Sequence, residues 1–587
     1  MRAPLCSLVT AASLSVLALA GTATAATAPS GPSTSVGSGG AAATVETLAT
    51  QAAIDTLRRG GNAVDAAITA AAVLGVTEPF SCGIGGGGFL LLRAAGGGVT
   101  SIDHRELAPA AMRADSFWEN GAPLAFNSAR FSGLSVGVPG TVAGWARALD
   151  RYGTISLAEA LQPAIRIARD GFLIDPIFFD QVRGNVDFFD DVPASAALFL
   201  DPDGTPKDVG TVFRNPDLAR AYERIAHLGA KGFYRGAIAD ALVGTVQNPP
   251  VAPTANHVWR AGLMTMRDLH TYTAPERSPT RVSYRGLDVY GMGPPSSGGS
   301  TVGEALNILE GYPLAAMSRE RQLHLFLEAS RYAFADRGAY LGDADFVPVP
   351  LRGLLSDQFA ATRRALIKED TAAPGAVAPG DPWPFEGAVG LLLAGASTDT
   401  EGLSTTHLSV SDSSGNVVSY TFTIESTGGA GLVVPGWGFL LNNELTDFDF
   451  SLLNHPNSVA GGKRPRSSMA PTIVTEAGRP LLTVGSPGGS TIITTVLQLL
   501  LDRLDAGMTL PQAIADPRAT QRNGATTQAE PGFPTAALTP YGHRFAANPE
   551  IGAATGIEFL AAGGLVAAAE PVRRGGGSAM VVSPIGP

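Results

Sequence analysis

Residues 405–424 limit the fold of this chain more than any other stretch, because they have the pattern of a β-hairpin. Apolar and polar residues alternate over 405–411 and again over 417–424, and residues 412–416 between them have the composition of a turn. One face of the hairpin is apolar, with Leu408, Val410, Val418, Tyr420, Phe422 and Ile424. The other face is polar, so the pattern predicts one face against a core and one suited to a wet cleft.

The turn also predicts a register. A three-residue loop with Gly415 in the left-handed conformation would pair Asp412 with Asn416. Counting back along the ladder then sets Thr405 opposite Thr423. Directly opposed residues have Cβ atoms roughly 5 Å apart, so the two threonine hydroxyls would be able to meet.

Thr405 follows a segment of different composition. Residues 372–404 are rich in Gly, Ala and Pro, which predicts an accessible, flexible connector. Cleavage of the Ser404–Thr405 bond would give Thr405 a free α-amine, whose ordinary pKa of about 8 suits a general base. That amine can activate the hydroxyl of its own residue, as in N-terminal nucleophiles. From composition alone, an ordinary strand threonine is the favoured interpretation.

Further motifs favour an N-terminal nucleophile over an ordinary strand threonine. They are Thr405-Thr406-His407-Leu408-Ser409-Val410, Thr421-Phe422-Thr423, Leu441-Asn442-Asn443-Glu444-Leu445-Thr446-Asp447-Phe448, Arg464-Pro465-Arg466-Ser467-Ser468-Met469-Ala470-Pro471-Thr472 and Gly485-Ser486-Pro487-Gly488-Gly489-Ser490. As an ordered set, from about Glu46 to the C-terminus, the chain resembles the gamma-glutamyltransferase (gamma-glutamyltranspeptidase) family.

The resemblance implies an α+β fold, the αββα sandwich of N-terminal-nucleophile hydrolases, with two β-sheets between helix layers. It implies one precursor that is cut between Ser404 and Thr405 into a large subunit, 26–404, and a small subunit, 405–587, which pair as a heterodimer. The expected catalytic residues are Thr405 as the nucleophile, Thr423 beside it, and Gly488 and Gly489 as backbone donors to the oxyanion.

The resemblance also assigns residues to the substrate. Arg105, Ser467 and Ser468 are expected to hold an α-carboxylate, for which a guanidinium is well shaped. Glu444 and Asp447 are expected to surround the α-ammonium.

The chain departs from the family pattern at two places. Glu425 stands where well-known members carry an asparagine, so the pocket is expected to be more acidic and its donor or acceptor range to differ. The stretch from Phe448 to Arg464 is shorter than in members that have a lid over the donor pocket. We therefore expect an open site that tolerates larger gamma-glutamyl donors.

The ends and the charge of the chain limit its location and partners. Residues 1–25 have a positive start, an apolar run and a small-residue site, which predicts a signal peptide and a secreted, periplasmic or extracellular protein without a membrane anchor. Residues 26–43 are expected to be a disordered arm. The formal net charge of −11, without a basic tract, argues against nucleic acid as a partner.

Metal and cofactor motifs are absent from the sequence. The only cysteines are Cys6, in the predicted signal peptide, and Cys82, and no His/Asp/Glu cluster has metal-ligand spacing. The resemblance implies a self-processing gamma-glutamyltransferase and glutathione hydrolase, with glutathione and other gamma-glutamyl donors, and with amino acids, dipeptides or water as acceptors. The alternatives are a related acylase for glutaryl or cephalosporin side chains, and an inactive, uncut binding protein.

Overall fold

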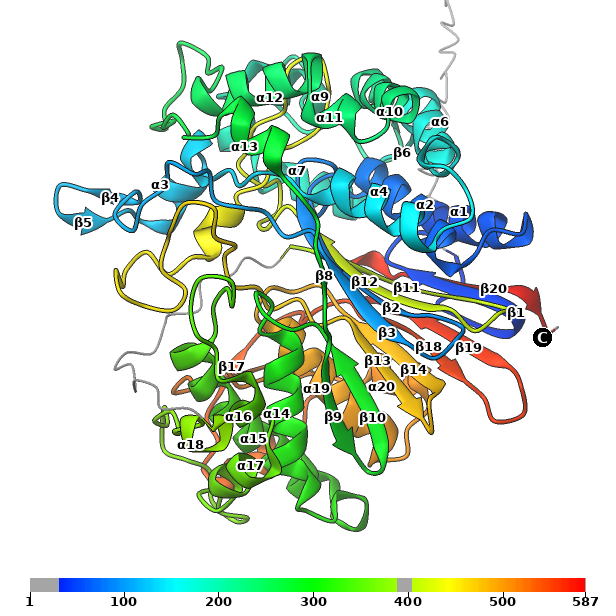
Figure 1. Ribbon diagram of the computed structural model, residues 1–587, viewed down its shortest axis with the longest axis vertical. Helices are drawn as coiled ribbons and strands as arrows, with labels where there is room; N and C mark the ends of the chain where they lie inside the picture. The colour runs from blue at the N-terminus through cyan, green and yellow to red at the C-terminus, as the bar shows by residue number, and fades with distance from the viewer. Residues whose placement is uncertain (1–30, 388–403, 586–587) are drawn as a thin grey trace, which may run out of the picture.

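The computed structural model describes residues 31–387 and 404–585, and a large β-sheet runs through its centre (Figure 1). Within these residues thirteen strands join through antiparallel neighbours into one sheet. In order they are β8 (Glu276–Arg277), β3 (Val99–Asp103), β2 (Gly87–Arg93), β12 (Val417–Thr423), β11 (Thr406–Asp412), β1 (Thr34–Thr44), β19 (Leu565–Ala569), β18 (Thr555–Phe559), β14 (Arg479–Gly485), β13 (Thr472–Glu476), β10 (Leu287–Gly291) and β9 (Thr280–Tyr284), with β20 (Ser578–Pro584) also paired to β1.

The sheet folds back on itself at β1. This strand pairs with β19 over residues 34–37 and with β11 over residues 40–43, and its register against β20 shifts between Ser38 and Ala41. The two halves then stack. The hydroxyl of Ser419 in β12 accepts from the N–H of Thr472 at 3.1 Å and donates to the carbonyl of Val484 at 3.3 Å. The expected pair of sheets is thus one continuous, curled sheet.

The first described strand corrects the expectation of a disordered arm. Residues 34–43 belong to β1, and residues 41–43 are fully buried. The small residues that suggested disorder are needed for close packing, because a Cβ on Gly37 would meet the carbonyl oxygen of Ser583 at 2.2 Å. The predicted signal peptide lies outside the described residues.

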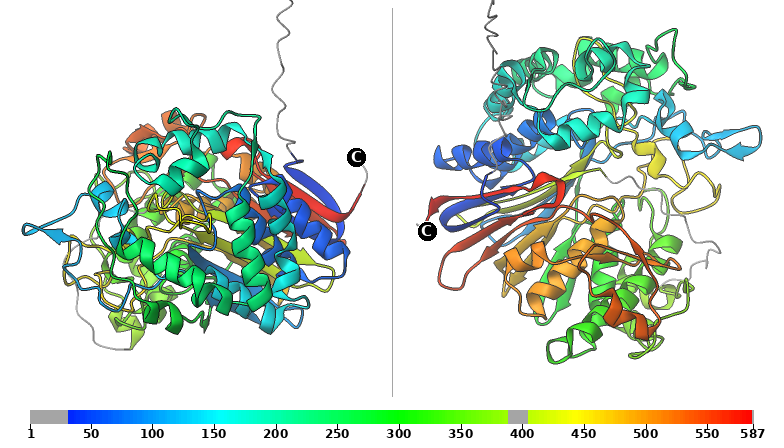
Figure 2. Two further views of the ribbon diagram at one scale, coloured as in Figure 1. Left: turned by 90° about the horizontal axis from the view of Figure 1, so that it is seen from above. Right: turned by 180° about the vertical axis from the view of Figure 1, so that it is seen from behind.

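Helices cover the outer face of each half of the sheet (Figures 1 and 2). Beside the half that holds β11 and β12 lie α1 (Thr47–Arg58), α2 (Ala63–Thr77), α4 (Thr141–Tyr152), α6 (Gln162–Asp170), α10 (Pro216–Leu228) and α12 (Ala237–Gln247). Asn62 begins α2 with a capping box. The apolar face of the hairpin, including Leu408 and Tyr420, shares a core with α2.

The second helix layer contains α14 (Gly298–Glu310), α15 (Arg319–Tyr340), α17 (Asp357–Arg364), α19 (Thr491–Leu504) and α20 (Leu510–Ala515). The described part of the predicted flexible connector, residues 372–387, is bound to this layer. The N–H of Gly380 donates to Asp336 at 2.6 Å, and its carbonyl accepts from the Tyr340 hydroxyl at 2.6 Å. The remainder of that connector, 388–403, lies outside the described residues.

Most of the polar face of the hairpin does not line a wet cleft, and its open end alone, at Thr405 and Thr423, borders a pocket. His407, Ser409 and Thr421 are fully buried between the two halves of the sheet, and Nδ1 of His407 lies 2.8 Å from the Thr421 hydroxyl. The imidazole packs against Gly485 of β14, where a Cβ would come within 2.3 Å of the ring. Alternation along a strand shows that two faces differ, but it does not distinguish water from a second polar layer.

Candidate active site

Two threonines meet at the open end of the hairpin. The ladder pairs Thr406 with Phe422, which sets Thr405 opposite Thr423 in the predicted register. The Thr405 hydroxyl donates to the Thr423 hydroxyl at 3.1 Å. The same Thr423 oxygen accepts from the N–H of Glu425 at 2.8 Å, so its position is fixed from two sides.

The backbone at Thr405 is strained. Its φ is +124°, a region that a β-branched residue rarely adopts and that costs on the order of 1–3 kcal/mol. Both residues of the predicted cleavage site are held in place. The hydroxyl of Ser404 donates to the carbonyl of Phe80 at 3.1 Å, and the Thr405 carbonyl accepts from the guanidinium of Arg574 at 2.8 Å.

A small pocket lies beside Thr405, with a cavity volume of about 10 Å³. It gathers the predicted site residues, apart from Gly488 and Ser404, and adds Met469 and Ile492, which the sequence did not single out. The predicted residues that line it are Arg105, Thr405, Thr423, Glu425, Glu444, Asp447, Ser467, Ser468 and Gly489.

Gly488 and Gly489 connect β14 to the first turn of α19. Their φ angles are +132° and +56°, a region that favours glycine. The carbonyls of both residues accept hydrogen bonds from Thr491 and Ile492 at the start of that helix. Gly489 lines the pocket beside Thr405, and Gly488 lies immediately behind it.

Arg105 lies just beyond the end of β3 and is 1% exposed. Its guanidinium forms ion pairs with Glu444 and Asp447 and also donates to the carbonyl of Arg466 at 3.0 Å. The cation expected at the α-carboxylate and the acids expected at the α-ammonium are therefore in direct contact in one buried network.

More carboxyl groups than one cation can balance surround Arg105. Burial and the nearby charge of Glu425 raise the pKa of Asp447 to about 8, and burial raises the pKa of Glu444 well above its ordinary value. Sequence reasoning missed a fourth acid, Glu106. It is fully buried, burial raises its pKa to about 8, and its carboxyl group interacts with that of Glu444. The signal in the sequence that could have identified Glu106 as a site residue is its position directly after Arg105.

Glu425 is held rigidly at the edge of the pocket. It has a left-handed φ of +79°, and its carboxylate accepts from the Ser426 hydroxyl and the Asn443 amide. The carboxylate also interacts with Asp447 and with the guanidinium of Arg130. The expected increase in acidity at this position is thus accompanied by a fixed geometry.

Ser467 and Ser468 are positioned from the second helix layer. The Ser468 hydroxyl accepts from the guanidinium of Arg337 in α15 at 2.7 Å, and Arg337 also donates to Ser297 at 2.9 Å. This leaves the Ser468 proton available to a ligand in the pocket. The sequence had treated Arg337 as scaffold. Among the residues that the structure describes, no group of three His, Cys, Asp or Glu side chains has an arrangement that could hold a metal ion.

The comparisons with known proteins agree with this geometry. The crystal structure of cephalosporin acylase from Bacillus halodurans superposes with a TM-score of 0.80 at 28% identity, covering 94% of this chain and 97% of that chain. The mixed α+β fold around one curled sheet is that of N-terminal-nucleophile hydrolases.

Sequence comparisons then give the family. A family model described as gamma-glutamyltranspeptidase matches residues 49–580. The glutathione hydrolase proenzyme of Bacillus subtilis (strain 168) is 38% identical over 512 residues, which are 86% of this chain and 84% of the relative. The acylase ACY 1 proenzyme of Pseudomonas sp. (strain V22) is 35% identical over 536 residues, 89% of this chain and 90% of the relative. The chain belongs to the gamma-glutamyltranspeptidase family.

Proposed function

We propose that the protein is a self-processing gamma-glutamyltransferase and hydrolase that acts on glutathione and related gamma-glutamyl amides. The observation that carries this proposal is the buried surplus of carboxylates around Arg105, next to a paired threonine. Buried charges need a partner, and the α-carboxylate and α-ammonium of a gamma-glutamyl group would supply one for the arginine and one for the acids.

Maturation would begin with attack of the Thr405 hydroxyl oxygen on the carbonyl carbon of Ser404. The peptide C–N bond breaks, the Thr405 nitrogen takes up a proton to become an amine, and the Ser404 acyl group is left as an ester on Thr405. Water then hydrolyses the ester and restores the hydroxyl. The strained φ of Thr405 supports this route, because cleavage releases the constraint on the backbone.

In catalysis the new α-amine of Thr405 would take the hydroxyl proton while the oxygen attacks the gamma-glutamyl carbonyl. The N–H groups of Gly488 and Gly489 would stabilise the oxyanion, and loss of one such donor costs on the order of 3 kcal/mol of transition-state stabilisation. Thr423 would orient the nucleophile. The amine of the donor leaves with a proton. The gamma-glutamyl group is then transferred from the Thr405 ester to water, an amino acid or a dipeptide.

An acylase for glutaryl or cephalosporin side chains is the second candidate, supported by the similarity to cephalosporin acylase and to acylase ACY 1. Such a donor lacks an α-ammonium. Because the pKa values of Asp447 and Glu106 are about 8, protons would be able to balance these acids at neutral pH. In alkaline solution these acids are ionised and need a cation. Charge therefore favours the gamma-glutamyl donor over the glutaryl donor most strongly at alkaline pH.

A matched pair of donors tests this choice. Gamma-glutamyl-p-nitroanilide and glutaryl-p-nitroanilide differ only in the α-ammonium, so we expect kcat/KM to favour the first by about 30-fold or more. Asp447 binds the ammonium when ionised, so the KM for the gamma-glutamyl donor should fall as the pH rises toward 8. Equal kcat/KM values for the two donors at pH 8 would overturn the proposal.

Processing is tested separately on a denaturing gel. The purified protein should give two bands, and Thr405→Ala should give one. An intact wild-type chain that still hydrolyses the anilide would contradict the mechanism. An intact and inactive chain would support the binding-protein alternative instead.

Export belongs to the same proposal. The predicted signal peptide would direct the chain to the periplasm or the exterior. Across residues 31–387 and 404–585 no helix combines the length and apolar character needed to cross a bilayer. The residues between Phe448 and Arg464 are not among the lining residues of the pocket, and the tolerance of larger donors stays a prediction.

A further inference from the structure

A second hollow lies on the outside of the first helix layer, away from the hairpin. It has a cavity volume of about 550 Å³, within the range typical of small-molecule sites. Its walls come from α4, from α11 (Lys231–Tyr234) with the residue that follows, and from α13 (Met266–Thr271) with the segment leading to β8. Figure 1 shows these three helices close together above β8.

The charge of this groove is opposite to that of the protein as a whole. The chain carries a formal net charge of −11, yet Arg147, Lys231 and Arg235 converge on the groove, and Asp150 is the only acid in the lining. Arg147 is partly balanced, because its Nε lies 3.3 Å from Glu276.

Lys231 and Arg235 are the two unbalanced cations of the groove. Both are exposed, and neither has an ion pair among the described residues. Cations that converge in a concave site attract and retain anions.

The floor of the groove contains two aromatic rings. The rings of Tyr234 and Tyr272 are stacked, parallel within 1° and with centroids 5.8 Å apart, and each residue is 8% exposed. Their hydroxyls point away from the groove and donate to the carbonyls of Pro139 and Arg105, both at 2.8 Å. Because both hydroxyls are engaged in this way, the rings offer mainly carbon atoms to the groove, and Ala146 on α4 is a small residue in its lining.

We propose that this groove is a binding site for small planar aromatic anions, such as aryl carboxylates or sulfonates. The aromatic part would lie on the tyrosine floor, and the acidic group would face Lys231 and Arg235. The Tyr272 hydroxyl holds the carbonyl of Arg105, so the floor of this site touches the backbone of the arginine in the catalytic pocket. The groove is nevertheless a separate site, because the two pockets share no lining residue.

Two fluorescent probes that differ only in charge test this site. 1-Anilinonaphthalene-8-sulfonate carries the anion, and N-phenyl-1-naphthylamine has the same rings without it. In titrations of the purified, full-length protein, Lys231→Gln combined with Arg235→Gln should weaken sulfonate binding by about tenfold or more. The affinity for the neutral probe should change less than about twofold, because the floor is intact.

A control variant removes the same amount of charge elsewhere. Arg113→Gln combined with Arg281→Gln alters two exposed arginines outside the groove and should leave the binding of both probes unchanged. Ala146→Phe should fill the groove and abolish saturable binding of both probes. Sulfonate binding that survives both the Lys231/Arg235 variant and Ala146→Phe would overturn the proposal, because the probe would then be bound elsewhere.

Discussion

At the scale of single residues, Glu425 is the side chain whose charge most changes the donor pocket. Its carboxylate helps to keep the pKa of Asp447 near 8. Glu425→Gln keeps the shape of the side chain but removes this repulsion, so Asp447 should ionise at lower pH. We expect the midpoint of the fall in KM for gamma-glutamyl-p-nitroanilide to move down by about one pH unit.

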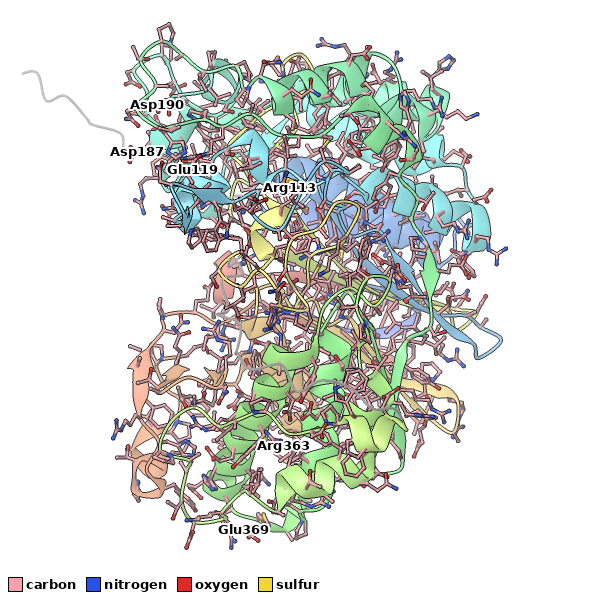
Figure 3. The ribbon with its side chains drawn as sticks, turned by 60° about the vertical axis from the view of Figure 1, so that its left-hand side comes forward. Arg113, Glu119, Asp187, Asp190, Arg363 and Glu369 are labelled. Atoms are coloured by element: carbon pink, nitrogen blue, oxygen red, sulfur yellow. The ribbon has the colours of Figure 1, made fainter. Side chains whose placement is uncertain are left out.

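The matched control for this change is Glu119→Gln, which removes an exposed carboxylate in the half of the molecule opposite to Arg363 (Figure 3). Glu119 pairs with Arg260 and lines no part of the pocket. Its KM profile should match that of the wild type. If Glu425→Gln gives the same profile as well, the charge of residue 425 does not control Asp447.

Arg574 is the residue that we expect to affect maturation without taking part in turnover chemistry. Its guanidinium donates to the carbonyl of Thr405, on the far side of the strained residue from the bond that breaks. Arg574→Met should let that carbonyl move and slow the conversion of precursor by about tenfold. The rate is measured on gels after synthesis, and Arg574→Lys should restore part of it.

An unchanged melting temperature would show that the Arg574 variant is folded. Equal rates of processing in Arg574→Met and wild type would rule out a positioning role. The donor pocket does not include Arg574, so kcat of the finally matured enzyme should be close to normal.

The sequence allowed part of this site to be derived and part only to be recognised. The turn at Gly415 was sufficient to predict that Thr405 and Thr423 meet. The role of Arg105 came entirely from family resemblance, and its direct pairing with Glu444 was not foreseen. Arg574 lies 169 positions from Thr405, and no local pattern indicates a contact over such a separation.

At the scale of secondary-structure elements, the two halves of the sheet depend on one close contact between β11 and β14. The imidazole of His407 fills the space where Gly485 has no side chain. Gly485→Ala would place a methyl group within 2.3 Å of that ring, and overpacking of this kind costs roughly 1–3 kcal/mol. Urea unfolding should show this loss.

Gly98→Ala is the control, because a Cβ there has open space around it. It should change the free energy of unfolding by less than about 0.5 kcal/mol. If Gly485→Ala were equally mild, His407 would have to move without cost, and the tight contact between the halves of the sheet would be wrong.

The range of each sequence signal explains which elements the sequence predicted correctly. The hairpin was found because alternation along a strand is a local signal. The fold of β1 was missed because its Gly, Ala and Ser residues are typical of disordered segments when considered alone. Their small size makes sense only next to β19, β20 and β11, which come from the other end of the chain.

At the scale of the whole molecule, the proposed subunits share one sheet. β1 and β2 belong to the segment before residue 404, and their neighbours β11, β12, β19 and β20 belong to the segment after it. β10 and β13 form another pair across the same division. The new ends created at Thr405 would therefore not divide the protein into two separable bodies.

This interleaving predicts that the cut protein remains a single folding unit. With an affinity tag at the C-terminus, the small subunit should retain the large one through washing at nanomolar concentration, because separation would break five strand pairs and the hydrophobic clusters that both segments share. Both pieces should unfold in one transition followed by circular dichroism, and only denaturant should separate them on the column. The Thr405→Ala precursor, being covalently continuous, provides the reference transition. Release of the large subunit in native buffer would mean that the sheet does not join the two segments as described.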